Sequence, residues 1–265
     1  MLGLANFKVN LGLYITEKRP DGFHNLETIF IPVFNRTDEI VLMPNFGRVK
    51  FEMTGADFVV DAEKNLCVKA FRLLQRDFNL PNVDIQLVKN IPSGAGLGGG
   101  SSDAAMVLKM TNEFFELKLT AEQLKVYAAQ LGSDVPFFIE NRPIYATGRG
   151  EILSNVEVDL SAWKISVFKP DFSISTAEAY AKIKPIAGRP HLCDLLAEPV
   201  ERWKEFFPND FEKALFPSYP ILAQIKQKFY DLGAVYAALS GSGSAVFALA
   251  KQPINLSLFF NGKDI

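Results

Sequence analysis

The stretch Pro92-Ser93-Gly94-Ala95-Gly96-Leu97-Gly98-Gly99-Gly100-Ser101-Ser102 decides what kind of fold this chain has. Five of the seven residues from Gly94 to Gly100 are glycine, and each loses much conformational freedom on folding, so such a run has a specific reason. A tight turn needs only one or two glycines. The run therefore favours a loop whose backbone N–H groups approach a ligand.

A helix is expected directly after this loop, from about Ser102 to Glu116. Ser101, Ser102 and Asp103 suit its N-terminus by capping and by charge. The helix dipole would add partial positive charge to the free amides of the loop. Loop and helix together predict an anion-binding nest.

Two known phosphate motifs can be compared with this stretch. The P-loop pattern GxxxxGK[ST] is absent, because no Gly-Lys-Ser or Gly-Lys-Thr occurs in the chain. Gly94, Gly96 and Gly99 match the dinucleotide pattern GxGxxG. That motif is expected to continue into a parallel strand, whereas here a second helix, Thr120–Leu131, follows the first. The NAD-binding interpretation is therefore the weaker one.

Outward from the loop, the chain mixes strands and helices without regular alternation, which predicts an α+β fold. Residues 7–15 alternate strictly, with Lys8, Asn10, Gly12 and Tyr14 on one face, and predict a half-buried strand. Thr120-Ala121-Glu122-Gln123 is a capping box. Further strands are expected at 26–33, 39–43, 49–53, 83–88, 143–146, 163–168, 234–239 and 245–250, and further helices at 63–78, 176–184, 199–206 and 221–232.

Composition and charge describe an ordinary globular protein. The 265 residues are 48% hydrophobic and 22% charged, and they suffice for a large core in one or two domains. The 28 basic and 30 acidic residues give a net charge of −2 without a basic run, which argues against a nucleic-acid binder. A small anionic ligand stays possible, because backbone amides bind phosphate without net charge.

Cysteines and histidines are too few for a disulfide framework or a multi-histidine metal site. Cys67 and Cys193 lie far apart, and His24 and His191 are the two histidines.

The N-terminus has no basic region before an apolar one, and the longest uncharged run, 232–250, contains too many glycines and serines for a membrane span. We expect a cytoplasmic protein with no membrane partner, either a monomer or a weak homodimer.

Three segments together resemble the GHMP kinases, the family of galactokinase, homoserine kinase, mevalonate kinase and phosphomevalonate kinase. Lys8-Val9-Asn10-Leu11 is similar to the family's first motif, the glycine run 92–102 to its phosphate-binding motif, and Ser240-Gly241-Ser242-Gly243-Ser244-Ala245 to its third motif. The three motifs occur in the family's order and span nearly the whole chain. Together they are far more specific than any one of them.

The stretch KVNLGLYITEKRPDGFHNLETIF, Lys8 to Phe30, is similar to one branch of the family, with support from Gly132-Ser133-Asp134-Val135-Pro136-Phe137-Phe138. Members of that branch transfer the γ-phosphoryl group of ATP to the 2-hydroxyl of a cytidine diphosphate ester of methylerythritol. This reaction belongs to the non-mevalonate route to isoprenoids. The resemblance implies the same small-molecule substrate here.

The resemblance also implies a two-domain fold. An N-terminal domain like domain 2 of ribosomal protein S5, which binds ATP, is expected over 1–158. A C-terminal ferredoxin-like α/β sandwich is expected over 159–265. The active site would lie in the cleft between the two domains.

The resemblance gives candidate catalytic roles to two residues. Asp134 would be the catalytic base that accepts the proton of the acceptor hydroxyl; by itself it is equally an N-cap of the next turn. Lys8 would keep Asp134 ionised and stabilise the transferring phosphoryl group, although most lysines on a strand face are simply solvated. Asn10, about 6–7 Å along the same strand face, would contact the substrate.

The remaining candidates divide between the cytosine and ATP. Phe23 and Tyr180 would stack on the base, His24 would hydrogen-bond its edge unless it is an ordinary turn histidine, and Thr176 would add a hydroxyl contact. ATP phosphates would lie on Pro92–Ser102. Asn65 and Lys89 would border the adenine. Mg²⁺ would bridge the phosphates, with Ser101 or Ser102 in reach and no acidic ligand that can be named.

Other functions remain open at the level of sequence. Another GHMP-type kinase, of the mevalonate or homoserine class, would have no use for Phe23, His24 and Tyr180. An NAD-linked oxidoreductase would use Gly94–Gly99. A non-catalytic nucleic-acid-binding module is conceivable because the N-terminal half of the fold resembles a ribosomal domain, but the net charge speaks against it.

Overall fold

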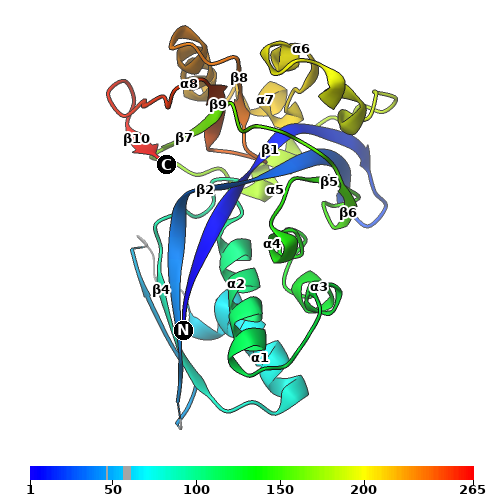
Figure 1. Cartoon of the computed structure of the whole chain (residues 1–265). Helices are drawn as coiled ribbons and strands as arrows, with labels where there is room; N and C mark the ends of the chain where they lie inside the picture. Colours follow the sequence, from blue (N-terminus) through cyan, green and yellow to red (C-terminus); the bar gives the residue numbers. More distant parts are fainter. Residues whose placement is uncertain (46, 56–60) are drawn as a thin grey trace. The chain divides into compact units, whose positions relative to one another are not determined.

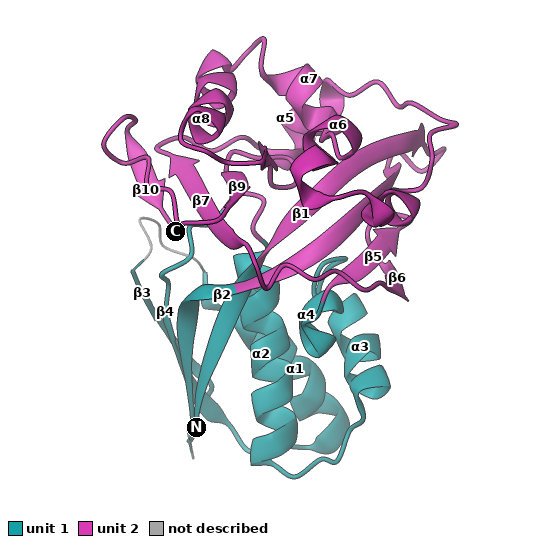
Figure 2. Ribbon diagram, turned by 45° about the horizontal axis from the view of Figure 1, so that its top comes forward, with its two compact units in different colours: residues 1–7, 34–93, 98–142 teal, residues 8–33, 94–97, 143–265 magenta. Residues whose placement is uncertain are grey.

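The computed structural model describes residues 1–45, 47–55 and 61–265, and the chain forms two compact units (Figures 1 and 2). Strands β1 (Leu2–Lys18) and β2 (His24–Pro44) contribute residues to both units, so each unit is described by itself. The first unit consists of residues 1–7, 34–93 and 98–142, and the second of residues 8–33, 94–97 and 143–265 (teal and magenta in Figure 2).

The first unit combines part of a sheet with helices. The second half of β2 pairs antiparallel with β4, which pairs parallel with β3. Helices α1 and α2 pack side by side, and α3 and α4 contact α2 (Figure 1). The elements are β3 (Lys50–Thr54), the 3₁₀ helix η1 (Ala62–Lys64), α1 (Leu66–Phe78), β4 (Val83–Val88), α2 (Gly99–Phe114), α3 (Ala121–Ala129) and α4 (Phe137–Glu140).

Local sequence explains most of these elements. α1 buries Cys67, Ala70, Phe71 and Leu74, the residues at three- and four-residue spacing, and ends at Asn79 in the left-handed conformation. The capping box of α3 is confirmed, because the Thr120 side chain and the Gln123 side chain each bond to the other's backbone N–H.

The second unit contains an antiparallel four-stranded sheet of order β10-β7-β9-β8. In the same unit, the first half of β2 pairs with β5, and β5 with β6. The elements are β5 (Ile144–Thr147), β6 (Ile152–Asn155), β7 (Lys164–Pro170), α5 (Thr176–Ala181), the 3₁₀ helices η2 (Leu192–Ala197) and η3 (Val200–Arg202), α6 (Trp203–Phe206), α7 (Asp210–Leu215), α8 (Pro220–Asp231), β8 (Tyr236–Leu239), β9 (Val246–Ala250) and β10 (Gly262–Asp264).

The core of the second unit joins its sheet to α7 and α8. Phe168 from β7, Phe211 from α7, Phe229 from α8 and Leu239 from β8 belong to one buried cluster. Burial of these apolar side chains stabilises the folded state by about 25 cal/mol for each Å² of apolar surface removed from water. The cluster fixes the hairpin β8–β9, and with it the glycine-rich third motif in the loop of that hairpin.

The structure differs from the sequence-based expectations in several places. The predicted half-buried strand is buried on both faces, since Lys8 and Asn10 are only 3% and 2% exposed. The strands expected at 26–33 and 39–43 are one long strand, β2, because the polar residues between them do not break it. The short elements α4, β6, α7 and β10 were not predicted, since three to six residues are too few to show a period.

The α+β fold class is confirmed, since the described residues form two sheets and their strands and helices do not alternate regularly. The domain boundary between residues 158 and 159 and the active-site cleft stay predictions. None of the helices in the described part of the chain has both the length and the apolar composition that a membrane span requires.

Candidate active site

Lys8 and Asn10 contact each other on one face of β1, as the alternation predicts. The Lys8 ammonium donates to Asn10 Oδ1 at 2.6 Å and to the Gly96 carbonyl at 2.9 Å. Asn10 Nδ2 donates to the Thr28 hydroxyl of β2 at 3.0 Å. The interpretation of Lys8 as a solvated lysine is wrong, because the strand face that carries it is buried.

Within the second unit, the segment Gly94–Leu97 lies against the third motif. Gly96 has a φ of 77°, and a Cβ at this position would overlap the carbonyl oxygen of Ser240. The Ser240 hydroxyl donates at 2.9 Å to the Gly96 carbonyl, which also accepts from Lys8. Glycine is thus required at position 96 by contact between two backbones. Residues of all three motifs meet at this peptide.

The remainder of the glycine run belongs to the first unit. α2 begins at Gly99, earlier than predicted, with Gly98 at its N-cap in the left-handed conformation (φ 70°). Among the described residues, no side chain caps this helix, so the expected capping by Ser101, Ser102 or Asp103 is wrong. These three residues already lie inside the helix. Its first N–H groups therefore receive no side-chain cap.

Pro92 and Ser93 precede the glycines in the first unit, and two serines follow them. Ser102 is buried and its N–H donates to the Gly98 carbonyl at 2.9 Å, while Ser101 is half-buried. Of the two hydroxyls that the sequence suggests for Mg²⁺, the one of Ser101 is therefore the more accessible.

Lys89 lies in a buried ionic cluster at the end of β4. Its ammonium pairs with Asp38 and, at 2.7 Å, with Asp103 of α2. Asp38 also accepts from the N–H groups of Asn90 and Ile91, at 2.6 and 2.8 Å. Burial raises the pKa of Asp103 to about 7, although the Lys89 charge opposes this. The sequence predicts Lys89 near the adenine. In the structure its ammonium lies beside the start of α2, where it pairs with Asp103.

Asn65 is the N-cap of α1. Its side-chain oxygen accepts from the N–H of Cys67 at 2.8 Å. This contact explains the residue type at position 65 without a ligand. The predicted contact of Asn65 with adenine stays a prediction.

Asp134 lies half-buried in the turn between α3 and α4. The four residues after it, 135–138, are buried. Pro136 occupies the N-cap position of α4, so Asp134 does not. Lys109 of α2 donates to the Phe138 carbonyl at 3.1 Å and ties this segment to α2. Asp134 belongs to the first unit and Lys8 to the second, and their predicted pairing stays a prediction.

The residues predicted to bind cytosine are partly brought together in the second unit. The rings of His24 and Tyr180 lie 5.1 Å apart between centroids, tilted by 32°. Phe211 contacts Tyr180 edge-on at 5.0 Å. Burial, followed by the charge of Lys18, lowers the pKa of His24. The neutral imidazole that this favours has one donor and one acceptor nitrogen.

Thr176 and Phe23 flank this pair in different ways. Thr176 is the first residue of α5, one helical turn before Tyr180, so both side chains emerge on one face of the helix. Phe23 follows the turn at Arg19–Gly22 and is 56% exposed. The guanidinium of Arg149 lies 5.1 Å from its ring centroid. An exposed ring at this position is available for stacking.

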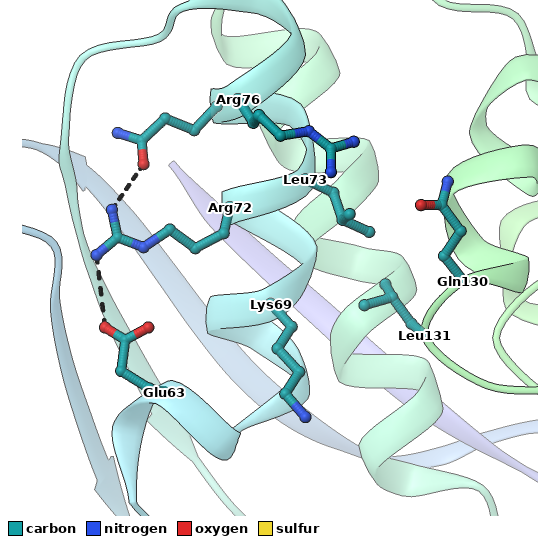
Figure 3. Close-up of a pocket in the computed structure, with 8 residues that line it drawn as sticks. Glu63, Lys69, Arg72, Leu73, Arg76, Gln130 and Leu131 are labelled. Atoms are coloured by element: carbon teal, nitrogen blue, oxygen red, sulfur yellow. Dashed lines mark hydrogen bonds and ion pairs between the residues drawn. The ribbon is translucent and has the colours of Figure 1, made fainter.

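A pocket of about 590 Å³ lies in the first unit, on one face of α1 (Figure 3). Lys69, Arg72, Leu73 and Arg76 line one side, and Gln130 and Leu131 the other. Arg72 is paired with Glu63 and Arg76 with Asp77. None of the predicted site residues lines this pocket, so we place no part of the predicted site in it.

Sequence reasoning missed several residues that hold the site together. Thr28 bonds to Asn10, Asp38 pairs with Lys89, and Asn209 bonds to the Gly241 carbonyl. Ser240 was identified as a motif residue, but its bond to the Gly96 carbonyl was not predicted. Asn209 followed by Asp210 and Glu212 is a helix-start signal that would have revealed α7. In the described ranges 1–45, 47–55 and 61–265, no cluster of three His, Cys, Asp or Glu residues has an arrangement suited to a metal ion.

Two family models match this chain. The model of the GHMP kinases N terminal domain matches residues 65–142, and the model GHMP kinases C terminal matches residues 194–257. The chain belongs to the GHMP kinase family. It is a small-molecule kinase that uses ATP, so the alternatives of an NAD-linked oxidoreductase and of a nucleic-acid-binding module are wrong.

Two similar proteins carry the same name. A 4-diphosphocytidyl-2-C-methyl-D-erythritol kinase from Bacteroides fragilis is 49% identical over 251 residues, which cover 94% of this chain and 92% of that protein. The kinase of the same name from Parabacteroides distasonis is 44% identical over 253 residues, which cover 96% of this chain and 93% of that protein.

Solved structures agree with this family. A crystal structure of 4-(cytidine 5'-diphospho)-2C-methyl-D-erythritol kinase matches with a TM-score of 0.82 and 32% identity, covering 100% of this chain and 98% of the other. Homoserine kinase from Cytophaga hutchinsonii matches with a TM-score of 0.72 and 17% identity, covering 94% of this chain and 85% of the other, and shows a common fold alone.

Proposed function

We propose that this chain phosphorylates the 2-hydroxyl of 4-diphosphocytidyl-2-C-methyl-D-erythritol with ATP, in the non-mevalonate route to isoprenoid precursors. The observation that carries the proposal is 49% identity over 94% of the chain to a kinase of that name. The two free cysteines are compatible with a cytoplasmic location.

ATP binding is assigned to the glycine run. The uncapped start of α2 would hold phosphate oxygens through backbone N–H groups and the helix dipole. Asn65 and Lys89 would border the adenine. Mg²⁺ would neutralise charge on the phosphates, with the half-buried Ser101 hydroxyl in reach.

Asp134 is proposed to accept the proton of the acceptor hydroxyl as that oxygen attacks the γ-phosphorus. Lys8 would stabilise the negative charge that develops on the transferring group. Its ammonium has a defined position, because it donates to Asn10 Oδ1 and to the Gly96 carbonyl. Asn10 would orient the acceptor from the same strand face.

The cytosine of the acceptor is assigned to His24, Tyr180, Phe23 and Thr176. The tilted contact between His24 and Tyr180 supports this, since the two residues come from distant parts of the sequence. A neutral His24 matches a base edge that presents both a donor and an acceptor. The aromatic rings would supply the stacking surface.

The acceptor is tested by measuring ADP release with a panel of alcohols at saturating ATP. We expect turnover with the cytidine diphosphate compound and little with mevalonate or homoserine. Equal turnover with mevalonate would leave only the broader kinase assignment.

The cytosine site is tested with Tyr180→Ala and His24→Ala. The first is expected to weaken the cytidine acceptor about 10- to 100-fold, since stacking contributes about 1–3 kcal/mol per base. His24→Ala should reduce discrimination between the cytidine and uridine forms of the acceptor. The affinity for ATP serves as the control and should stay unchanged. Parental behaviour of both variants toward both acceptors would remove these residues from the cytosine site.

The base is tested with Asp134→Asn, which keeps the shape of the side chain and loses proton acceptance. We expect binding of ATP and acceptor to persist and turnover to fall by about 10²–10⁴-fold. Binding is measured by calorimetry and turnover by ADP release. Turnover near that of the parent would exclude Asp134 as the base.

A further inference from the structure

Both polar atoms of the Asn209 side chain, Nδ2 and Oδ1, form hydrogen bonds within the second unit. It is 2% exposed. Nδ2 donates to the carbonyls of Leu239 and Gly241, both at 2.9 Å. Oδ1 accepts from the N–H of Phe211 at 2.9 Å and so caps α7. One buried amide therefore holds both a helix start and a loop.

The two carbonyls bound by Asn209 belong to the residues on either side of Ser240. Ser240 is the motif residue whose backbone abuts Gly96 and whose hydroxyl donates to the Gly96 carbonyl. The same carbonyl accepts from Lys8. A continuous chain of hydrogen bonds thus runs from Asn209, through the peptides around Ser240 and through Gly96, to the Lys8 ammonium.

The backbone next to Asn209 is tied to the strand that carries Lys8. The N–H of Leu13 in β1 donates to the Pro208 carbonyl at 2.9 Å, and Leu13 and Asn209 form a parallel bridge. Asn209 is therefore attached to β1 through its backbone and to the third motif through its side chain. It connects the strand that carries the first motif with the third motif, without belonging to either motif.

We propose that Asn209 is a positioning residue for phosphoryl transfer, which holds the third motif so that Gly96 and Lys8 keep their places. This inference rests on the proposed role of Lys8 at the transferring phosphoryl group. Loss of the two Nδ2 donors leaves two carbonyls beside a buried side chain without their partner. The loop then relaxes, and the Gly96 carbonyl that helps to orient Lys8 shifts with it.

The effect should appear in kcat rather than in KM. A misplaced Lys8 loses an interaction that is strongest in the transition state, whereas substrates still bind to the other groups. Small misplacements of catalytic groups lower rates by up to about 100-fold. We expect kcat to fall about 10- to 100-fold, with both KM values within about threefold of the parent.

The test uses Asn209→Ser and Asn209→Asp, both of which retain an oxygen able to cap α7 but lose the two donors. Thr120→Ala is the matched control, because it removes the cap of α3, whose described hydrogen bonds do not involve Asn209, Ser240, Gly96 or Lys8. All variants are compared with the parent on whichever acceptor the parent turns over fastest, at a temperature where circular dichroism shows them folded.

The proposal requires low kcat in both Asn209 variants and parental kcat in Thr120→Ala. Parental kcat in a folded Asn209→Ser would overturn it, as would an equal loss of kcat in Thr120→Ala. If both Asn209 variants fail to fold, Ser240→Ala is measured instead, because it removes the hydrogen bond from the Ser240 hydroxyl to the Gly96 carbonyl. Parental kcat in Ser240→Ala would overturn the proposal as well. The identity of the parent's best acceptor tests the proposed function separately.

Discussion

Helices α1 and α2 pack side by side in the first unit, yet they begin in different ways (Figure 1). Asn65 caps α1 with its side-chain oxygen, at 2.8 Å from the N–H of Cys67. α2 has Gly98 at the N-cap, followed by Gly99 and Gly100, and no side chain of the described residues bonds to its first N–H groups.

The difference is consistent with the proposal that the start of α2 binds the phosphates of ATP. Every helix has four N–H groups without an intrahelical partner at its start. At α1 a neighbouring side chain satisfies one of them, and at α2 the sequence supplies glycines instead of a cap. An uncapped start with little side-chain bulk suits the close approach of phosphate oxygens.

The largest effect is expected for Gly100→Asp, which tests whether the uncapped start of α2 binds phosphate. A Cβ at Gly100 would meet only Leu66, at 4.0 Å, so a side chain fits there. A carboxylate at the start of α2 stabilises the helix but repels phosphate, by about 4 kcal/mol for charges 4 Å apart at an effective dielectric constant of 20. We expect KM for ATP to rise about 100-fold or more while the thermal midpoint stays or rises.

Gly100→Ala is the control, because it adds a methyl group without charge. It should raise KM for ATP far less than Gly100→Asp and should stabilise the helix by about 0.5–1 kcal/mol. Equal KM values for parent and Gly100→Asp would show that ATP does not use the start of α2.

A second test concerns the ionic cluster that supports α2 and has no counterpart among the described contacts of α1. The pKa of Asp103 is raised to about 7 in the folded protein, chiefly by burial, whereas it is near 3.9 in an unfolded chain. Between these values the folded state binds the proton and the unfolded state does not. This group therefore favours folding fully below pH 4, and its contribution is lost as the pH rises through 7.

Urea unfolding of the parent and of Asp103→Asn at pH 5 and pH 8 measures this contribution. The free energy of unfolding of the parent should fall more between these pH values than that of the variant. Equal changes in both proteins would show that Asp103 does not titrate in this range.

The smallest effect is expected for Asn65→Ala, which removes the cap of α1. Loss of such a cap lowers the free energy of unfolding by about 0.5–2 kcal/mol. Asn65→Ser keeps a capping oxygen and should restore most of the stability. If Asn65 also contacts adenine, KM for ATP will rise in Asn65→Ala; an unchanged KM would reduce its role to that of a cap.

Local patterns predicted the elements with a clear period or signal. The spacing of Cys67, Ala70, Phe71 and Leu74 identified α1, and the capping box identified the start of α3. The start of α2 was placed too late, because serine and aspartate are favoured N-cap residues and a glycine cap carries no such signal. α7 was missed because its six residues show no clear period and its start signal at Asn209 was not used.

The sequence by itself determined the motifs, the α+β class and the face of β1 that Lys8 and Asn10 share, since these depend on residue types and on spacings of a few residues. Only the tertiary structure decided that this face is buried, that Lys89 pairs with Asp38 and Asp103, and that Asn209 holds the third motif. The bonds that join Gly96 to Lys8 and to Ser240 connect residues 88 and 144 positions apart. No local pattern encodes such pairings, because they arise when the chain folds back and buries polar groups that must then find partners.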